Sequence, residues 1–91
     1  MSYLEKLEDI KTRALNEIDE VSKLNDLEAW ERQYLGSKGE LTNLLKQLGS
    51  LSPEDRPAAG RAANAIKTEL TAAYEERRMI LAAVIAEQHL A

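Results

Sequence analysis

Apolar residues recur at helical spacing along two long stretches of this chain, one ending near residue 35 and one beginning after Pro53. Positions three and four apart lie on one face of an α-helix, so each stretch predicts a helical arm with an apolar seam. The first seam comprises Leu4, Leu7, Ala14, Ile18 and Val21, with Lys11 as its polar member, and the second comprises Ala59, Ala63, Ile66, Leu70, Ala73, Arg77, Ile80 and Val84. The pattern predicts an all-α fold, a long antiparallel helical hairpin of the coiled-coil type with a short helix at its tip.

We expect residues 1–91 to form a single helical-hairpin domain. The first arm is predicted at about residues 3–35, with a break near residues 24–26. Either Asn25 or Asp26 has the side chain of a helix N-cap, which would start a second helical segment there.

The tip is predicted at about residues 36–52, with a short helix at about residues 40–48. The second arm is predicted at about residues 53–91, because a serine cap at Ser52 precedes a proline at the first helical position. As straight helices the two arms would measure roughly 50 and 58 Å, similar enough to cover each other. In such a hairpin, Leu7 and Ile80 would lie together near the open end.

Composition limits the function classes. The chain has 91 residues and no cysteine, which suits one small domain in a reducing compartment and excludes a disulfide framework. No apolar run approaches the roughly 20 residues that span a bilayer, and the start lacks the layout of a signal peptide. The single histidine, His89, has no partner at metal-ligand or triad spacing. We therefore expect a cytoplasmic chain without a membrane partner, and no catalytic, cofactor-binding or metal-binding residue within it.

The net charge of −4 hides an uneven distribution. Residues 1–31 carry −5, residues 32–67 carry +3 and residues 68–91 carry −2. In a hairpin the middle of the sequence is one physical end, so positive charge would gather at the tip. Local potential steers an anionic partner, and the tip is therefore the expected contact.

The segment from Gly36 to Gly39 carries the most specific candidate chemistry. Lys38 lies between these two glycines and is the first candidate for a phosphate contact, while Gly36 and Gly39 would permit close approach of another backbone. A basic surface near the tip could follow an RNA backbone, and its further candidates are Arg32, Lys46, Arg56 and Arg61. The alternative for each is an ordinary exposed charge, or for Arg56 and Arg61 an ion pair with Asp55 or another nearby acid on the same helix.

Trp30 and Tyr34 lie four residues apart on one helix face. They could stack on unpaired RNA bases, but packing against the long second arm is the favoured interpretation. Arg77 lies on the second seam and either extends over apolar surface or pairs with Glu17 or Glu20 across the hairpin.

The ordered residues of the middle segment resemble a known family. They run from Leu27-Glu28-Ala29 through Tyr34-Leu35-Gly36-Ser37-Lys38-Gly39-Glu40-Leu41-Thr42 to Leu51-Ser52-Pro53-Glu54-Asp55-Arg56-Pro57. This string resembles the N-terminal coiled-coil arm of the bacterial phenylalanine–tRNA ligase alpha subunit. The tip of that family commonly reads Tyr-Leu-Gly-Lys-Lys-Gly, so Ser37 removes one positive charge.

The resemblance implies an arm that binds phenylalanine-specific tRNA. It also implies a parent class II synthetase in which the alpha subunit joins a beta subunit as an α2β2 heterotetramer and uses ATP and Mg²⁺. No stretch of these 91 residues resembles the class II catalytic motifs, so we expect a domain of a longer subunit. The alternative is a freestanding antiparallel coiled coil that serves as a protein-interaction or chaperone-like module.

Overall fold

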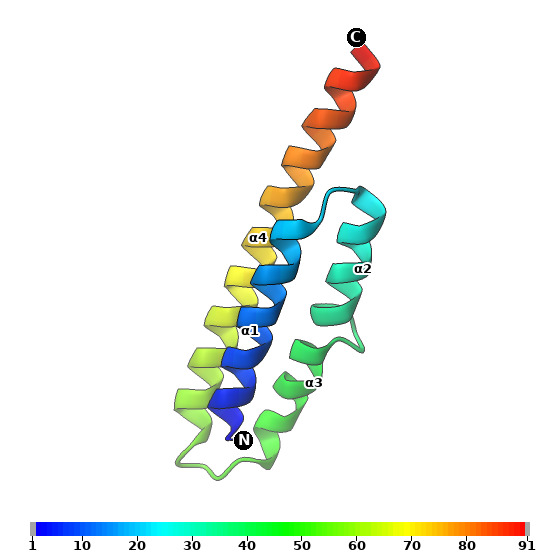
Figure 1. Cartoon of the computed structure of the whole chain (residues 1–91). Helices are drawn as coiled ribbons and strands as arrows, with labels where there is room; N and C mark the ends of the chain where they lie inside the picture. Colours follow the sequence, from blue (N-terminus) through cyan, green and yellow to red (C-terminus); the bar gives the residue numbers. More distant parts are fainter. Residues whose placement is uncertain (1, 91) are drawn as a thin grey trace.

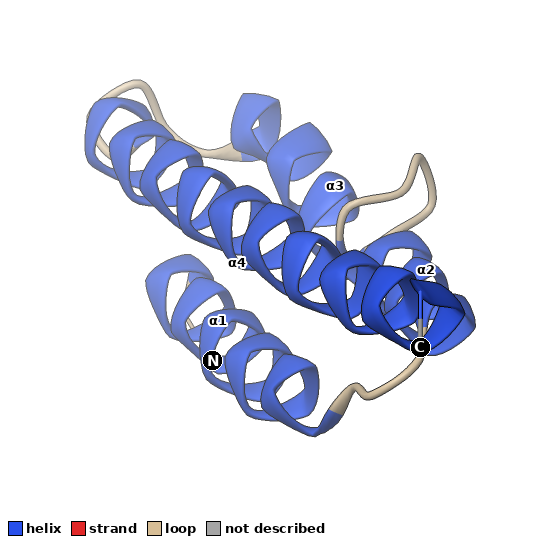
Figure 2. Ribbon diagram, turned by 90° about the horizontal axis from the view of Figure 1, so that it is seen from above, coloured by secondary structure: helices blue, strands red, loops and turns tan. Residues whose placement is uncertain are grey.

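Helices make up nearly all of residues 2–90, the part of the chain that this computed structural model describes. They are α1 (Tyr3–Glu20), α2 (Leu24–Tyr34), α3 (Glu40–Lys46), the 3₁₀ turn η1 (Gln47–Ser50) and α4 (Arg56–Leu90). Side chains are described through residue 83, so those of Val84 and His89 lie outside the described ones. Residues 2–90 contain helices and loops and no strand, which confirms the predicted all-α class (Figure 2).

The helices form a narrow bundle of 57 × 19 × 18 Å (Figure 1). The chain rises through α1, returns through α2 and α3, and rises again through the whole of α4, whose last turns extend beyond the other helices. The α2–α3 segment therefore runs antiparallel to α4, whereas the prediction gave that direction to the whole first arm, residues 3–35. The short helix α3 packs along α4 instead of capping an end.

The first arm differs from the prediction because it folds back on itself. The reversal lies at Val21–Lys23, earlier than the expected break near residues 24–26, and both Val21 and Lys23 have extended backbone angles. Helix α2 begins at Leu24 with Lys23 as its N-cap and without a side-chain cap bond, so the caps predicted at Asn25 or Asp26 are wrong. Folding back lets α2 pack against α1 and α4 together, which a straight arm could not do.

Two ion pairs show the direction of α1 relative to α4. Lys11 Nζ lies 3.3 Å from Glu69 Oε2, and Arg77 Nη2 lies 3.6 Å from Asp19 Oδ1. Both partners advance along their helices in the same sense, so α1 runs parallel to α4. Arg77 thus pairs across helices as one interpretation expected, but with Asp19 and not with Glu17 or Glu20.

The core runs along the line where the helices meet. Its buried apolar side chains are Leu7, Ile10, Ala14 and Ile18 of α1, Leu27, Trp30 and Tyr34 of α2, Leu41 and Leu44 of α3, and Ala59, Ala63, Ile66, Leu70 and Leu81 of α4. About half of the predicted seam residues are among them, and Val21 and Ala73 are half-buried. Leu4 and Ile80 are exceptions, being 47% and 45% exposed, because they lie near the ends of the packed region.

Helix α4 begins at Arg56, three residues later than predicted. The Ser52 carbonyl accepts hydrogen bonds from the backbone N–H groups of Asp55 and Arg56 at 3.0 and 3.1 Å. The Ser52 hydroxyl lies 2.9 Å from the Asp55 carboxylate and donates to it. Because the hydroxyl is used in this way, Ser52 closes a turn before α4. It does not act as the N-cap of a helix that begins at Pro53, as predicted.

Candidate nucleic-acid interface

The turn between α2 and α3 is closed by its own backbone. The N–H groups of Leu35 and Gly36 both donate to the Glu31 carbonyl, at 2.7 and 2.8 Å. Gly39 N–H donates to the Gly36 carbonyl at 2.8 Å, and the Thr42 hydroxyl donates to the Leu35 carbonyl at 3.3 Å. The turn lies part-way along the bundle and not at its end (Figure 1).

Gly36 and Gly39 are required by close packing inside this turn. A Cβ atom at Gly39 would lie 2.6 Å from the Tyr34 carbonyl carbon, and one at Gly36 would lie 2.9 Å from the Arg32 carbonyl oxygen. No glycine in the described residues has a positive φ. The need for glycine therefore comes from neighbouring backbone, and Gly39 is itself buried.

Three of the predicted cations gather around the turn and are exposed: Arg32, Lys38 and Lys46. We call them the turn cluster. The Lys46 ammonium lies 3.5 Å from the Ser37 carbonyl, while Arg32 is in the last helical turn of α2, four residues before Gly36. Among the described side chains, none forms an ion pair with a member of the turn cluster.

The other two predicted cations lie apart from the turn cluster. The Arg56 guanidinium donates to the carbonyls of Gly49 and Leu51 at 3.3 and 3.1 Å, so it fastens the loop that leads into α4. Arg61 is exposed on α4, between the buried Ala59 and Ala63 in sequence and on the opposite face of the helix. The structure thus brings three of the five cations together.

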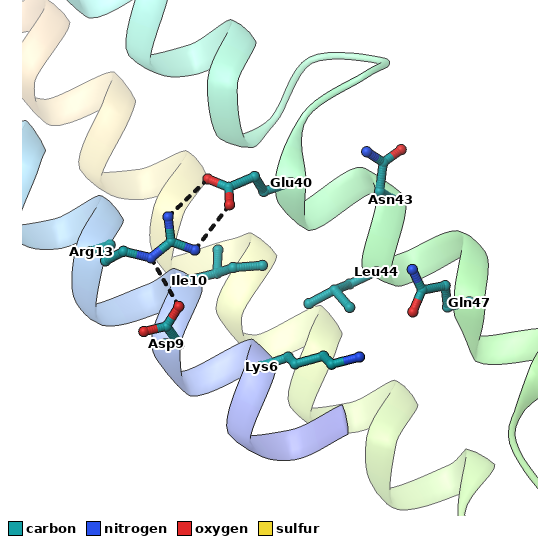
Figure 3. Close-up of a pocket in the computed structure, with 8 residues that line it drawn as sticks. All are labelled: Lys6, Asp9, Ile10, Arg13, Glu40, Asn43, Leu44 and Gln47. Atoms are coloured by element: carbon teal, nitrogen blue, oxygen red, sulfur yellow. Dashed lines mark hydrogen bonds and ion pairs between the residues drawn. The ribbon is translucent and has the colours of Figure 1, made fainter. Parts of the chain in front are cut away.

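An ion pair that the sequence did not indicate holds the first residue of α3. Arg13 of α1 donates to both carboxylate oxygens of Glu40, at 2.9 and 3.2 Å, and to Asp9 at 2.9 Å (Figure 3). These bonds, with Glu40 the largest contribution, raise the pKa of Arg13 above its usual value. The four-residue spacing of Asp9 and Arg13 is compatible with an ion pair along one helix. The pairing of Arg13 with Glu40 on α3 could not be read from the sequence.

The Arg13–Glu40 pair borders a hollow of about 280 Å³ between α1 and α3. Ile10 and Leu44 also line it, and Figure 3 shows Lys6, Asn43 and Gln47 around it. The hollow therefore has both apolar and polar walls. Its two basic side chains, Lys6 and Arg13, are balanced in charge by two carboxylates, those of Asp9 and Glu40.

The aromatic residues belong to the core, as the favoured interpretation predicted. Trp30 Nε1 donates to the Ala14 carbonyl at 2.8 Å, and the Trp30 ring stacks on Tyr74 with centroids 6.4 Å apart. The Tyr34 hydroxyl donates to Glu17 at 2.6 Å. Burial, followed by this hydrogen bond, raises the pKa of Tyr34 well above its usual range. Both rings are covered, so neither is placed to stack on a base.

The described part of the chain offers neither a metal site nor a membrane span. No three carboxylate or imidazole side chains within it gather as metal ligands would. None of its helices is long and apolar enough to cross a membrane.

Comparison with known proteins shows the family. Residues 22–90 match the family described as aminoacyl tRNA synthetase class II, N-terminal domain. The chain belongs to this family. The match begins after α1 and includes α2, α3 and α4.

The chain is similar to several phenylalanine–tRNA ligase alpha subunits. It is 48% identical to that of Natranaerobius thermophilus over 73 residues, which are 80% of this chain and 21% of the relative. It is 44% identical to that of Dehalococcoides mccartyi over 80 residues, with coverages of 88% and 23%. Over 88 residues it is 40% identical to that of Rhodospirillum rubrum, with coverages of 97% and 25%. The resemblance inferred from the sequence is confirmed, and the chain spans about a fifth to a quarter of these relatives.

Proposed function

We propose that this chain is the tRNA-binding N-terminal arm of a phenylalanine–tRNA ligase alpha subunit, and that the turn cluster contacts phosphates of the tRNA. The observation that carries the proposal is the gathering of Arg32, Lys38 and Lys46 around one turn of a domain of this family. Three exposed cations at one place attract a polyanion, since each phosphate neutralised releases condensed counterions.

The segment that forms the turn carries net positive charge despite the acidic total. In residues 32–46, Glu40 is the one acidic residue against three basic ones, and Arg13 neutralises it through two hydrogen bonds. The outward side of α1 carries acidic residues such as Glu5 and Glu8. RNA would therefore approach the α2–α3 side and avoid α1.

The parent enzyme supplies the chemistry. By its resemblance to these relatives, it would join phenylalanine to its tRNA with ATP and Mg²⁺, pair with a beta subunit in an α2β2 assembly and act in the cytoplasm. The residues of this chain would contribute tRNA binding. Of the candidates outside the turn cluster, Arg61 is exposed and would make a secondary phosphate contact, while Arg56 would act mainly by fastening its loop.

A freestanding protein-interaction or chaperone-like module is the other class considered. Its apolar seam would have to be available to a partner or client. In this structure the seams of α1, α2 and α4 cover one another, which favours a self-contained arm that acts through its charged surface.

Binding of a phenylalanine tRNA transcript to the chain tests the proposal. We expect the Lys38→Ala/Lys46→Ala variant to bind more weakly, and the slope of log affinity against log salt to shrink by about 0.7–0.9 for each phosphate that is no longer neutralised. The matched control is Lys6→Ala/Lys23→Ala, which removes the same charge from two exposed lysines outside the turn. Equally weakened binding in both variants, or no binding by the unaltered chain, would overturn the proposal.

A further inference from the structure

Glu40 stands where it could weaken the turn cluster. It follows Lys38 by two residues and begins α3, whose opposite end carries Lys46. An unrestrained carboxylate at this position would be within reach of the neighbouring ammonium groups and would compete with phosphates for them. The structure shows it turned toward α1 and engaged by Arg13 (Figure 3).

The Arg13–Glu40 pair is bidentate, so it fixes the orientation of the Glu40 carboxylate. A guanidinium that binds both oxygens of a carboxylate defines its direction as well as its distance. Asp9 accepts a third hydrogen bond from the same guanidinium, which fixes the arginine from the α1 side. The pair joins residues 27 apart in sequence and ties α1 to the first residue of α3.

The turn depends on where α3 begins. Gly39 is the N-cap of α3, and its carbonyl accepts the Asn43 N–H at 3.0 Å while its own N–H donates to Gly36. A shift of Glu40 would move Gly39, and with it the backbone that presents Lys38. The Lys46 contact to the Ser37 carbonyl spans the same turn.

We infer that Arg13 is a positioning residue for tRNA binding: through Glu40 it holds the α2–α3 turn in place and withdraws that carboxylate from Lys38 and Lys46. This inference rests on the proposed function. Helix α1 lies outside the family match. Under this inference it supports tRNA binding although it contacts no phosphate itself.

Lys11 provides the control. Lys11 also ties α1 to another helix by an ion pair, to Glu69 of α4, and lies away from the turn. Arg13→Ala and Lys11→Ala each remove one cation from α1. The first leaves Glu40 and Asp9 without this partner, and the second leaves Glu69 without it. A merely structural role would make the two variants alike.

The test measures tRNA affinity and backbone hydrogen exchange in both variants of the whole chain. We expect Arg13→Ala to weaken binding about three- to tenfold, the loss that follows when one or two side chains must be ordered on binding. Its salt slope should change less than that of Lys38→Ala/Lys46→Ala, because both lysines remain available to phosphates. The amides of Gly39 and Asn43 should exchange faster, while Lys11→Ala leaves both affinity and these amides as they were.

Adding Glu40→Gln to Arg13→Ala should recover part of the affinity, since the released carboxylate is then gone. Equal losses of affinity in Arg13→Ala and Lys11→Ala, or normal affinity in Arg13→Ala while Lys38→Ala/Lys46→Ala binds weakly, would overturn the positioning role and leave the proposed function intact. Failure of the unaltered chain to bind tRNA would overturn both.

Discussion

Lys11 and Glu69 form an ion pair 3.3 Å long that marks the register of α1 against α4. Asp19 and Arg77, each eight residues further along its helix, repeat the contact at 3.6 Å. Two contacts in the same register require that the helices run parallel. This arrangement replaces the straight two-arm hairpin, in which α1 and α4 would run in opposite directions.

Cysteine pairs can test that register, because the chain has no cysteine of its own. Leu15 and Ala73 lie four residues beyond Lys11 and Glu69 and line the same hollow between α1 and α4. We expect Leu15→Cys/Ala73→Cys to form a disulfide within one chain, detected as a faster band on non-reducing gels and by mass spectrometry. The pair Leu7→Cys/Ile80→Cys should not, and its efficient closure would instead support the straight hairpin.

Features that depend on spacing within one helix could be predicted from the sequence. The seams, the all-α class and the packing of Trp30 and Tyr34 are of this kind, and the structure confirms them. The reversal at Val21–Lys23 could not be predicted, because a straight arm and a folded one offer the same seam. The choice depends on long-range contacts such as that from Trp30 Nε1 to the Ala14 carbonyl.

The candidate site divides in the same way. Arg32, Lys38 and Lys46 could be found because they flank a turn in the sequence, and one short segment brings them together. Arg56 differs from them only through its bonds to the loop carbonyls, which depend on the folded chain. Arg13 could not be found, because its partner Glu40 is distant in sequence and reaches it only once the chain has folded back.

Trp30 should be the most sensitive aromatic position. Trp30→Phe removes the indole N–H that donates to Ala14 and reduces the surface stacked on Tyr74. We expect a loss of about 2 kcal/mol in the free energy of unfolding. Urea titration followed by circular dichroism measures it, since the chain has one tryptophan and the variant loses that fluorescence. Met79→Ala, at a side chain that is 73% exposed, should change stability by less than about 0.5 kcal/mol.

Two glycines should respond in opposite directions to alanine. At Gly39 the new Cβ would lie 2.6 and 2.7 Å from backbone atoms of Tyr34, so the turn must shift, and we expect a loss of about 1–3 kcal/mol. At Gly60, inside α4, no atom beyond its chain neighbours and the nearby helix backbone lies within 4 Å of the added Cβ. There alanine should stabilise by about 1 kcal/mol, because it favours helix more than glycine does. Thermal melts of both variants check this, and stabilisation by Gly39→Ala would contradict the described turn.

Alkaline pH should weaken the bundle through Tyr34. Its pKa in the folded chain is raised above the ordinary value of 10.0, so the stability that its neutral hydroxyl contributes is fully present below pH 10. As the pH rises above 10, the unfolded chain releases this proton while the folded chain keeps it, and stability falls. Burial raises the pKa of Tyr3 as well, which acts in the same direction.

Tyr34→Phe separates this effect from other alkaline changes. At neutral pH the variant should be less stable by about 1 kcal/mol, because it lacks the hydrogen bond to Glu17, whose exposed carboxylate can be hydrated instead. Above pH 10 the difference between the two proteins should narrow, since only the unaltered chain loses the Tyr34 contribution. Urea midpoints at pH 8, 10 and 11 measure this gap. A gap that widens with pH would mean that Tyr34 ionises more readily in the folded chain, against the burial and the carboxylate contact described above.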